Sequence, residues 1–85
     1  MAIVTLRYWA AAKDAAGCDE EKVDARTLAE ALAAAVVSSD RAGLRAVLAR
    51  SSFLVNVDPV GKRPPESIVL PDDAVVEVLP PFAGG

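Results

Sequence analysis

The sequence predicts an α+β fold in which a mixed β-sheet packs on one main helix. Three observations carry this prediction. Strand-like segments stand near both ends of the chain, at residues 3–9 and 74–79, and a capped amphipathic helix begins at residue 28 between them. The chain has 85 residues, which is enough for one compact domain. A sheet laid on one helix is the simplest way to bury the apolar stripe of that helix.

The first segment, residues 3–9, is rich in β-branched and aromatic side chains, which favour strands. Its alternation places three apolar side chains on one face: Val4, Leu6 and Tyr8. Residues 10–16 are mostly alanine and predict a short helix that ends at Gly17. The charged stretch 20–25 predicts a second strand, at an edge of the sheet.

Thr27 and Glu30 form a capping box, in which Thr27 is the N-cap and Glu30 reaches back to it. Apolar side chains then recur with the spacing of one helix face: Leu28, Ala31, Leu32, Ala35 and Val36. We expect Leu32 to be buried, so that Leu32→Ala costs about 2–5 kcal/mol. Residues 38–40 end this helix or cap a second one, which continues to about Arg50.

Residues 53–57 predict a third strand, and a proline at the second position of 58–61 predicts a turn there. Residues 74–79 predict the last strand, with Val76 and Val78 toward the core. If the first and last strands are parallel neighbours joined by a right-handed crossover, the fold is a β-grasp, the ubiquitin-like fold. The pattern alone leaves a ferredoxin-like α+β sandwich open.

Composition argues against several classes of function. The net charge is −3 and the pI is about 4.7, so we expect no nucleic-acid surface. No apolar run is long enough to span a bilayer and no signal segment is expected, which predicts a cytoplasmic protein without a membrane partner. The chain has no His, the commonest general base, and one cysteine, Cys18, whose role we expect to be incidental. We therefore expect no bound metal or cofactor.

The last strand is followed by the segment Pro80-Pro81-Phe82-Ala83-Gly84-Gly85. We divide the chain into a domain, residues 1–79, and a flexible tail, residues 80–85. The two glycines carry no Cβ, so their backbone can enter a narrow channel in a partner protein. The two prolines stiffen the exit from the domain.

We predict that the reactive group is the terminal carboxylate of Gly85, which becomes an electrophile only when its oxygen is made a good leaving group, as in an acyl-adenylate. The rest of the tail is expected to contact partner proteins: Pro80, Pro81, Phe82, Ala83 and Gly84. Phe82 is the large side chain of the tail, and we expect it to fill an apolar pocket. Phe82→Ala should weaken binding without unfolding the domain.

At these residues the chain resembles the MoaD family of small molybdopterin synthase subunits, within the ubiquitin-like MoaD/ThiS sulfur carriers. That family ends in Pro-Pro-x-x-Gly-Gly, which residues 80–85 match position by position. The family also has an aromatic pair, a basic–acidic pair and a glycine near its start, which here are similar: Tyr8-Trp9, Lys13-Asp14 and Gly17. The stretches 53–58 and 70–76 resemble it too, although Asp73 stands where the family often has glycine.

The resemblance implies a defined cycle. An E1-like activating enzyme of the MoeB type would use ATP to adenylate Gly85, and a sulfur donor would convert the adenylate to a thiocarboxylate. The tail would then enter a MoaE-like large subunit, where the sulfur passes to a cyclic pyranopterin precursor of molybdopterin. In this scheme the catalytic side chains belong to the partners. Because both partners receive the same tail, we expect them to bind overlapping surfaces.

Other functions stay open. A sulfur carrier for thiazole or cysteine biosynthesis has the same Gly-Gly chemistry, but ThiS-like chains are usually shorter and lack the Pro-Pro-x-x before the glycines. A ubiquitin-like protein modifier would join Gly85 to a lysine, and its activation is the same up to the adenylate. A plain binding domain would carry out no covalent chemistry at the tail.

Overall fold

The computed structural model describes residues 2–37 and 41–81. Their helices and strands follow the predicted order of strand, helix, strand, two helices and three strands. The strand before the last lies at residues 58–59, however, whereas residues 68–70, which the sequence predicts as a short strand, make only an isolated bridge between Thr27 and Val69. The elements are β1 (Ile3–Tyr8), α1 (Ala10–Ala16), β2 (Glu20–Asp24), α2 (Leu28–Ala35), α3 (Ala42–Arg50), β3 (Ser52–Val55), β4 (Asp58–Pro59), η2 (Pro65–Ser67) and β5 (Val75–Leu79).

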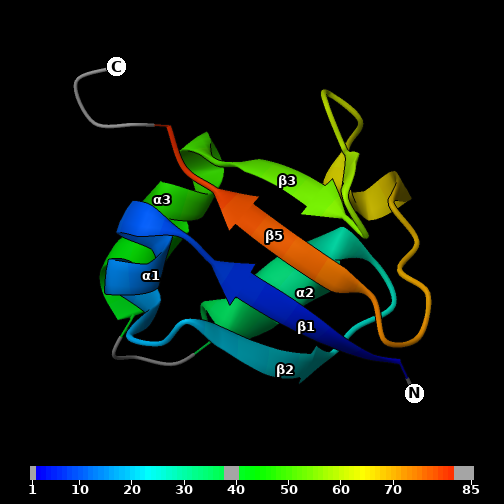
Figure 1. The fold of residues 1–85 in the computed structure, drawn as a ribbon, viewed down its shortest axis with the longest axis horizontal. Coiled ribbons are helices and arrows are strands. Elements are labelled where there is room, and N and C mark those ends of the chain that lie inside the picture. The colour runs from blue at the N-terminus through cyan, green and yellow to red at the C-terminus, as the bar shows by residue number, and fades with distance from the viewer. Residues whose placement is uncertain (1, 38–40, 82–85) are drawn as a thin grey trace.

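The sheet has five strands in the order β2-β1-β5-β3-β4 (Figure 1). The first and last strands are parallel neighbours, with Thr5 opposite Val75 and Tyr8 opposite Val78. The other pairs of strands are antiparallel. Because the parallel pair lies at the centre of the sheet and the helices lie in the connection between its two strands, the fold is the predicted β-grasp and not a ferredoxin-like sandwich.

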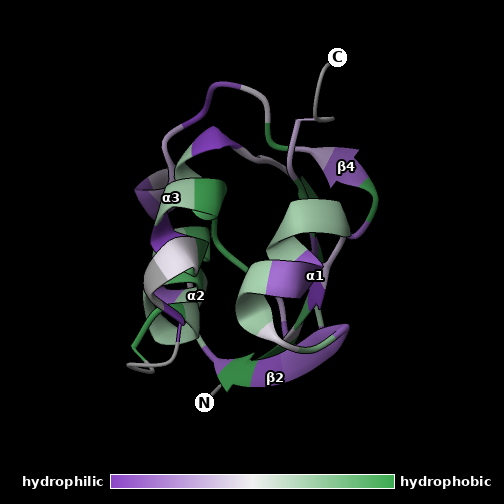
Figure 2. Ribbon diagram, turned by 90° about the vertical axis from the view of Figure 1, so that its left-hand side faces the viewer, coloured by the Kyte–Doolittle hydropathy of each residue, from purple (hydrophilic) through white to green (hydrophobic). Residues whose placement is uncertain are grey.

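The core lies between the sheet and the helices. In Figure 1, α2 and α3 lie behind the sheet and α1 lies at its end. The predicted inward faces are confirmed, because the following side chains are buried: Val4, Leu6 and Tyr8 of β1, and Val76 and Val78 of β5. They pack against buried side chains of the helices, among them Leu28 and Leu44. At the edge, β2 is mostly hydrophilic (Figure 2), as predicted.

Local signals in the sequence place the ends of two helices correctly. Gly17 follows α1 with φ 80°, the left-handed conformation that glycine adopts without a steric penalty. The Thr27 hydroxyl accepts a hydrogen bond from the Glu30 N–H over 3.2 Å, as a capping box requires. The Glu30 carboxylate does not return to Thr27, however, and instead accepts the N–H of Arg26 over 2.8 Å.

The burial predicted for Leu32 is wrong in degree. On α2 the buried positions are Leu28, Ala31 and Ala35, whereas Leu32 and Val36 are half-buried. Because the face with Leu28, Ala31 and Ala35 is turned toward the core, Leu32 lies at its margin, next to the gap between α2 and α3. There it lines a surface groove of about 290 Å³.

The hairpin after β3 also differs from the prediction. Strand β3 ends at Val55 rather than at residue 57, and residues 58–59 pair as β4 instead of opening a turn. The chain reverses earlier because Asn56 and Val57 take left-handed conformations, with φ 48° and 68°. The proline in β4 is tolerated because this strand is at the edge of the sheet.

Candidate functional site

The predicted tail begins where the central strand β5 ends. Leu79 is the last residue of β5 and pairs with Ser52 of β3. Pro80 is half-buried and Pro81 is exposed. The other predicted site residues lie outside the described residues: Phe82, Ala83, Gly84 and Gly85. The division into a domain and a flexible tail therefore stays a prediction.

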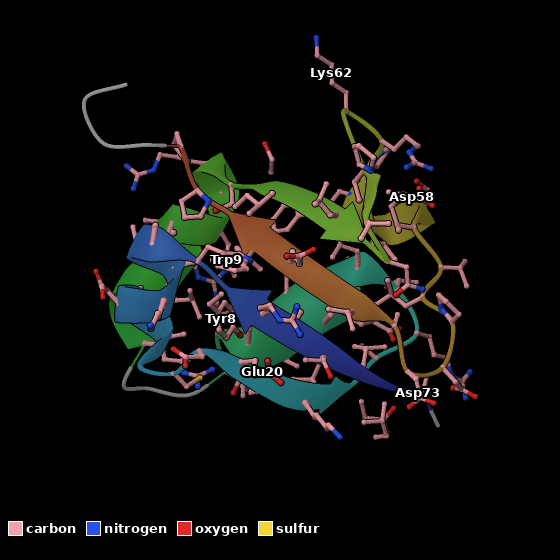
Figure 3. All side chains as sticks on the ribbon, in the orientation of Figure 1. Tyr8, Trp9, Glu20, Asp58, Lys62 and Asp73 are labelled. Atoms are coloured by element: carbon pink, nitrogen blue, oxygen red, sulfur yellow. The ribbon has the colours of Figure 1, made fainter. Side chains whose placement is uncertain are left out.

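Trp9 lies beside the point where β5 ends (Figure 3). Its backbone N–H donates to the carbonyl of Val78 over 3.3 Å, and its indole N–H donates to Oε1 of Glu77 over 3.2 Å. The ring is held in place and is still 46% exposed. Exposed aromatic side chains are common anchors in protein interfaces. The sequence analysis did not select Trp9 as a site residue.

The side of the sheet away from the helices is called the open sheet face here. Its alternating positions include Arg7, Leu54, Val75, Glu77 and Leu79, as the strand registers show. Leu54, Val75 and Leu79 are each only partly buried. The open sheet face thus offers apolar side chains along β3 and β5 from the start of the tail to the far end of β5.

Charged groups border the open sheet face near Trp9. Arg7 Nε lies 3.4 Å from Oε1 of Glu20, its neighbour across the β1–β2 pair. Nζ of Lys13, on α1, lies 2.9 Å from Oδ1 of Asp19, and the hydrogen bond between them raises the pKa of Lys13. These side chains line a hollow of about 220 Å³ together with Tyr8 and Trp9. Since its cations are held by carboxylates, the hollow is suited to polar recognition and supplies no neutral amine for catalysis.

Comparison with known proteins decides the family. The ThiS family model matches residues 6–85, which is nearly the whole chain. The chain belongs to the ThiS family. Comparison with curated protein sequences gives no match.

Several solved structures have the same fold as this ThiS-family chain. Small archaeal modifier protein 1 of Methanosarcina acetivorans is 20% identical with a TM-score of 0.82, over 100% of this chain and 98% of that one. A protein assigned as subunit 1 of the molybdopterin converting factor of Pyrococcus furiosus is 22% identical with a TM-score of 0.74, over 96% and 100%. A complex of subunits 1 and 2 of this factor from Helicobacter pylori matches at 23% identity and a TM-score of 0.68, over 98% and 99%.

One partly buried polar cluster of this ThiS-family domain lies away from the open sheet face. The Tyr8 hydroxyl donates to Glu21 over 2.5 Å, and Arg41 Nη2 donates to the same carboxylate over 2.9 Å. Arg41 also donates to the carbonyl of Ala35 over 3.0 Å, which ties α3 to the end of α2. The hydrogen bond from Arg41 lowers the pKa of Glu21, and burial raises the pKa of Tyr8. Because the charges of Glu21 and Arg41 pair with each other, we assign the cluster a structural role, in which it connects β1, β2 and the start of α3.

The remaining sequence candidates do not form a second site. Cys18 is a free, half-buried thiol whose sulfur lies 3.8 Å from Arg41 Nη2, at the margin of the polar cluster. Within residues 2–37 and 41–81 no group of three or more Cys, Asp or Glu could hold a metal ion. None of the helices in these two segments is long and apolar enough to cross a bilayer.

Proposed function

We propose that this ThiS-family chain is a sulfur carrier whose reactive group is the carboxylate of Gly85. The observation that carries the proposal is the place where the tail begins, at the end of β5. The sequence Pro80-Pro81-Phe82-Ala83-Gly84-Gly85 continues the central strand β5 beside the exposed Trp9. Six extended residues span roughly 20 Å, which is enough to reach into a partner's active site. The domain would then act in recognition and the tail in chemistry.

The chemistry requires activation by a partner. A carboxylate oxygen of Gly85 attacks the α-phosphorus of ATP in an E1-like enzyme, and pyrophosphate leaves. A sulfur nucleophile then attacks the carbonyl carbon of the acyl-adenylate, and AMP leaves with the former carboxylate oxygen. If the nucleophile is hydrosulfide, loss of its S–H proton leaves the thiocarboxylate. If it is the persulfide of a donor protein, a thiol then reduces the acyl disulfide that forms, which gives the thiocarboxylate and a disulfide. This chain binds no cofactor in the scheme, and the ATP belongs to the activating enzyme in the cytoplasm.

For the sulfur acceptor, we propose a cyclic pyranopterin precursor held by a MoaE-like large subunit, so that the chain serves as the small subunit of molybdopterin synthase. Two observations support this choice: the Pro-Pro-x-x-Gly-Gly ending, and the structural similarity to subunit 1 of molybdopterin converting factors, including one in complex with its subunit 2. The second candidate is a protein modifier, which the similarity to small archaeal modifier protein 1 favours.

The open sheet face next to the tail is the proposed docking surface for these partners. It adjoins the start of the tail, carries Leu54 and Leu79, and ends at the half-exposed Trp9. A partner that binds the chain from Pro81 onward lies next to the end of β5, so the open sheet face is within its reach. Apolar side chains of β3 and β5 lie there beside charged ones, namely Glu77 and Arg7 on the inner strands and Glu20 at the edge, and protein interfaces commonly combine both kinds.

Reconstitution tests the acceptor. The thiocarboxylated chain is mixed with the large subunit and the cyclic pyranopterin precursor, and formation of the dithiolene of molybdopterin is followed over time. We expect one sulfur to leave the tail for each sulfur gained by the pterin. A thiocarboxylate that persists in this mixture but is consumed by a thiazole-forming or cysteine-forming enzyme would reassign the carrier to that pathway. Gly85 recovered in an isopeptide bond to a lysine would support the protein modifier.

A further inference from the structure

The turn between β3 and β4 contains a residue that is poorly suited to its backbone conformation. Asn56 and Val57 have φ 48° and 68°, both in the left-handed region. Asparagine tolerates this region, and glycine is the usual residue at the second position of such a hairpin turn. A β-branched side chain at positive φ is a true outlier and is energetically unfavourable. Val57 is the β-branched residue among the described non-glycine residues with positive φ.

Contacts within the chain do not offset this cost. The side chain of Val57 is 76% exposed, so it buries little apolar area. The turn is held by its neighbour instead. Asn56 donates its backbone N–H to the carbonyl of Val75 over 2.9 Å, and its Oδ1 accepts the N–H of Val75 over 2.9 Å. The turn would therefore also form with glycine or asparagine at position 57. Valine is less favourable there, because its backbone conformation is strained and because its apolar side chain is exposed to solvent.

The turn continues the proposed docking surface at the end away from the tail. Figure 1 shows β3 ending on the side of the sheet opposite to the end of β5. The register pairs Ser52 with Leu79 and Val55 with Val76, which places the end of β3 roughly 13 Å from Pro80, the start of the tail. A protein interface of standard size covers roughly 800 Å² on each partner, a patch of roughly 16 Å radius. A partner centred on Leu54 thus reaches both Trp9 and Val57.

We propose that Val57 is a contact for the large subunit that receives the tail, and that it inserts against an apolar surface of that subunit. The proposal rests on the proposed function and adds a second anchor to it, at the opposite end of the open sheet face from Trp9. The strain at Val57 then has a physical reason. A rigid turn presents an apolar side chain at a fixed position, so little conformational entropy is lost when the complex forms. Valine at position 57 lowers the stability of the free domain and raises the stability of the complex.

The test compares stability with affinity in the full chain. Val57→Asn and Val57→Gly suit the left-handed conformation and remove the apolar contact. We expect both variants to unfold at a higher denaturant concentration than the wild type, and to bind the large subunit at least about fivefold more weakly. Val69→Asn is the matched control, because Val69 is also 76% exposed and is absent from the residues with positive φ. It should leave the affinity unchanged.

The possible results separate the two proposals. If the Val57 variants are more stable and bind the large subunit as tightly as the wild type, Val57 is not a contact and only this inference fails. Reduced stability of Val57→Asn would show a role within the domain and would also overturn it. If the Val57 variants bind only the activating enzyme more weakly, Val57 contacts that enzyme and not the large subunit, and the inference is wrong. If the wild type itself does not bind the large subunit, the proposed function fails as well.

Discussion

The indole N–H of Trp9 donates a hydrogen bond to Oε1 of Glu77 over 3.2 Å, although the two residues are 68 positions apart in the chain. Glu77 lies on β5 and Trp9 follows β1, the two strands that form the central parallel pair. The bond orients an exposed aromatic ring next to the segment from which the tail departs. The open sheet face therefore has a fixed aromatic side chain at the position where a tail-binding partner must approach.

The first prediction concerns this ring. Trp9→Ala should lower the affinity for the large subunit and for the activating enzyme at least about fivefold, because both must cover the start of the tail. The stability of the domain should change by only about 1 kcal/mol or less, because the ring is half-exposed. Titration followed by calorimetry and by denaturant unfolding measures both quantities.

Ile3→Ala is the control for Trp9→Ala. Ile3 lies on the same outward face of β1, at the end away from the tail, and is 39% exposed. Its replacement should leave both affinities unchanged. Equal losses for the two variants would mean that the whole face, and not the position beside the tail, determines binding. Wild-type affinity of Trp9→Ala for both partners would remove Trp9 from the docking surface.

The second prediction concerns the pH dependence of stability. The pKa of Glu21 is lowered from its ordinary value of 4.5, chiefly by the hydrogen bond from Arg41. Its contribution is therefore fully present above pH 4.5 and is lost as the pH falls through the lower pKa of the folded state. Glu21→Gln should reduce the free energy of unfolding by about 1.5–3 kcal/mol at neutral pH, and the difference from the wild type should shrink below about pH 4.

Tyr8→Phe provides the control for this pH response. It removes one hydrogen bond to Glu21 and leaves the ion pair with Arg41, so it should cost about 1 kcal/mol. The loss of stability in acid should remain in this variant. Denaturant unfolding between about pH 2 and 7 separates the two cases, and a Glu21→Gln effect that is constant over this range would show that the ion pair does not stabilise the domain.

The third prediction revises the cost that the sequence predicts for Leu32→Ala, by comparison with Leu28→Ala. Leu28 is fully buried, and Leu28→Ala should cost about 2–5 kcal/mol. Leu32 is half-buried and faces the groove between α2 and α3, so Leu32→Ala should cost less than half as much. The two substitutions remove the same atoms from the same helix, so the difference in their unfolding free energies reports burial alone. Equal costs would contradict the orientation of α2.

These differences show what the sequence could predict. Local signals placed the cap at Thr27, the end of α1 at Gly17 and the inward face of β1, because hydrogen bonding and side-chain alternation depend on neighbours in the chain. The exposure of Leu32 depends on which side of α2 is turned toward the core, which is a tertiary effect. The early hairpin was missed because Asn56-Val57 lacks the glycine that usually marks such a turn.

The candidate site was predicted in part. The tail and its role stay predictions from the Gly-Gly ending, whereas the family match confirms the resemblance from which its chemistry was inferred. Trp9 and Glu77 could not be paired, because their contact depends on the parallel register of β1 and β5. The role of Arg41 was missed for the same reason, since its partner Glu21 belongs to a different element.

The most direct test of the carrier is the thiocarboxylation of Gly85. The full chain and a chain that lacks Gly85 are incubated with the activating enzyme, ATP and a sulfur donor, and the intact masses are measured. The full chain should gain the mass difference between one sulfur and one oxygen. The shortened chain should remain folded but gain nothing, because its carboxylate falls short of the activating site by about 3.3 Å, and misplacement of about 1 Å can already reduce a rate a hundredfold. Equal thiocarboxylation of both chains would contradict the assignment of Gly85 as the sulfur-bearing residue.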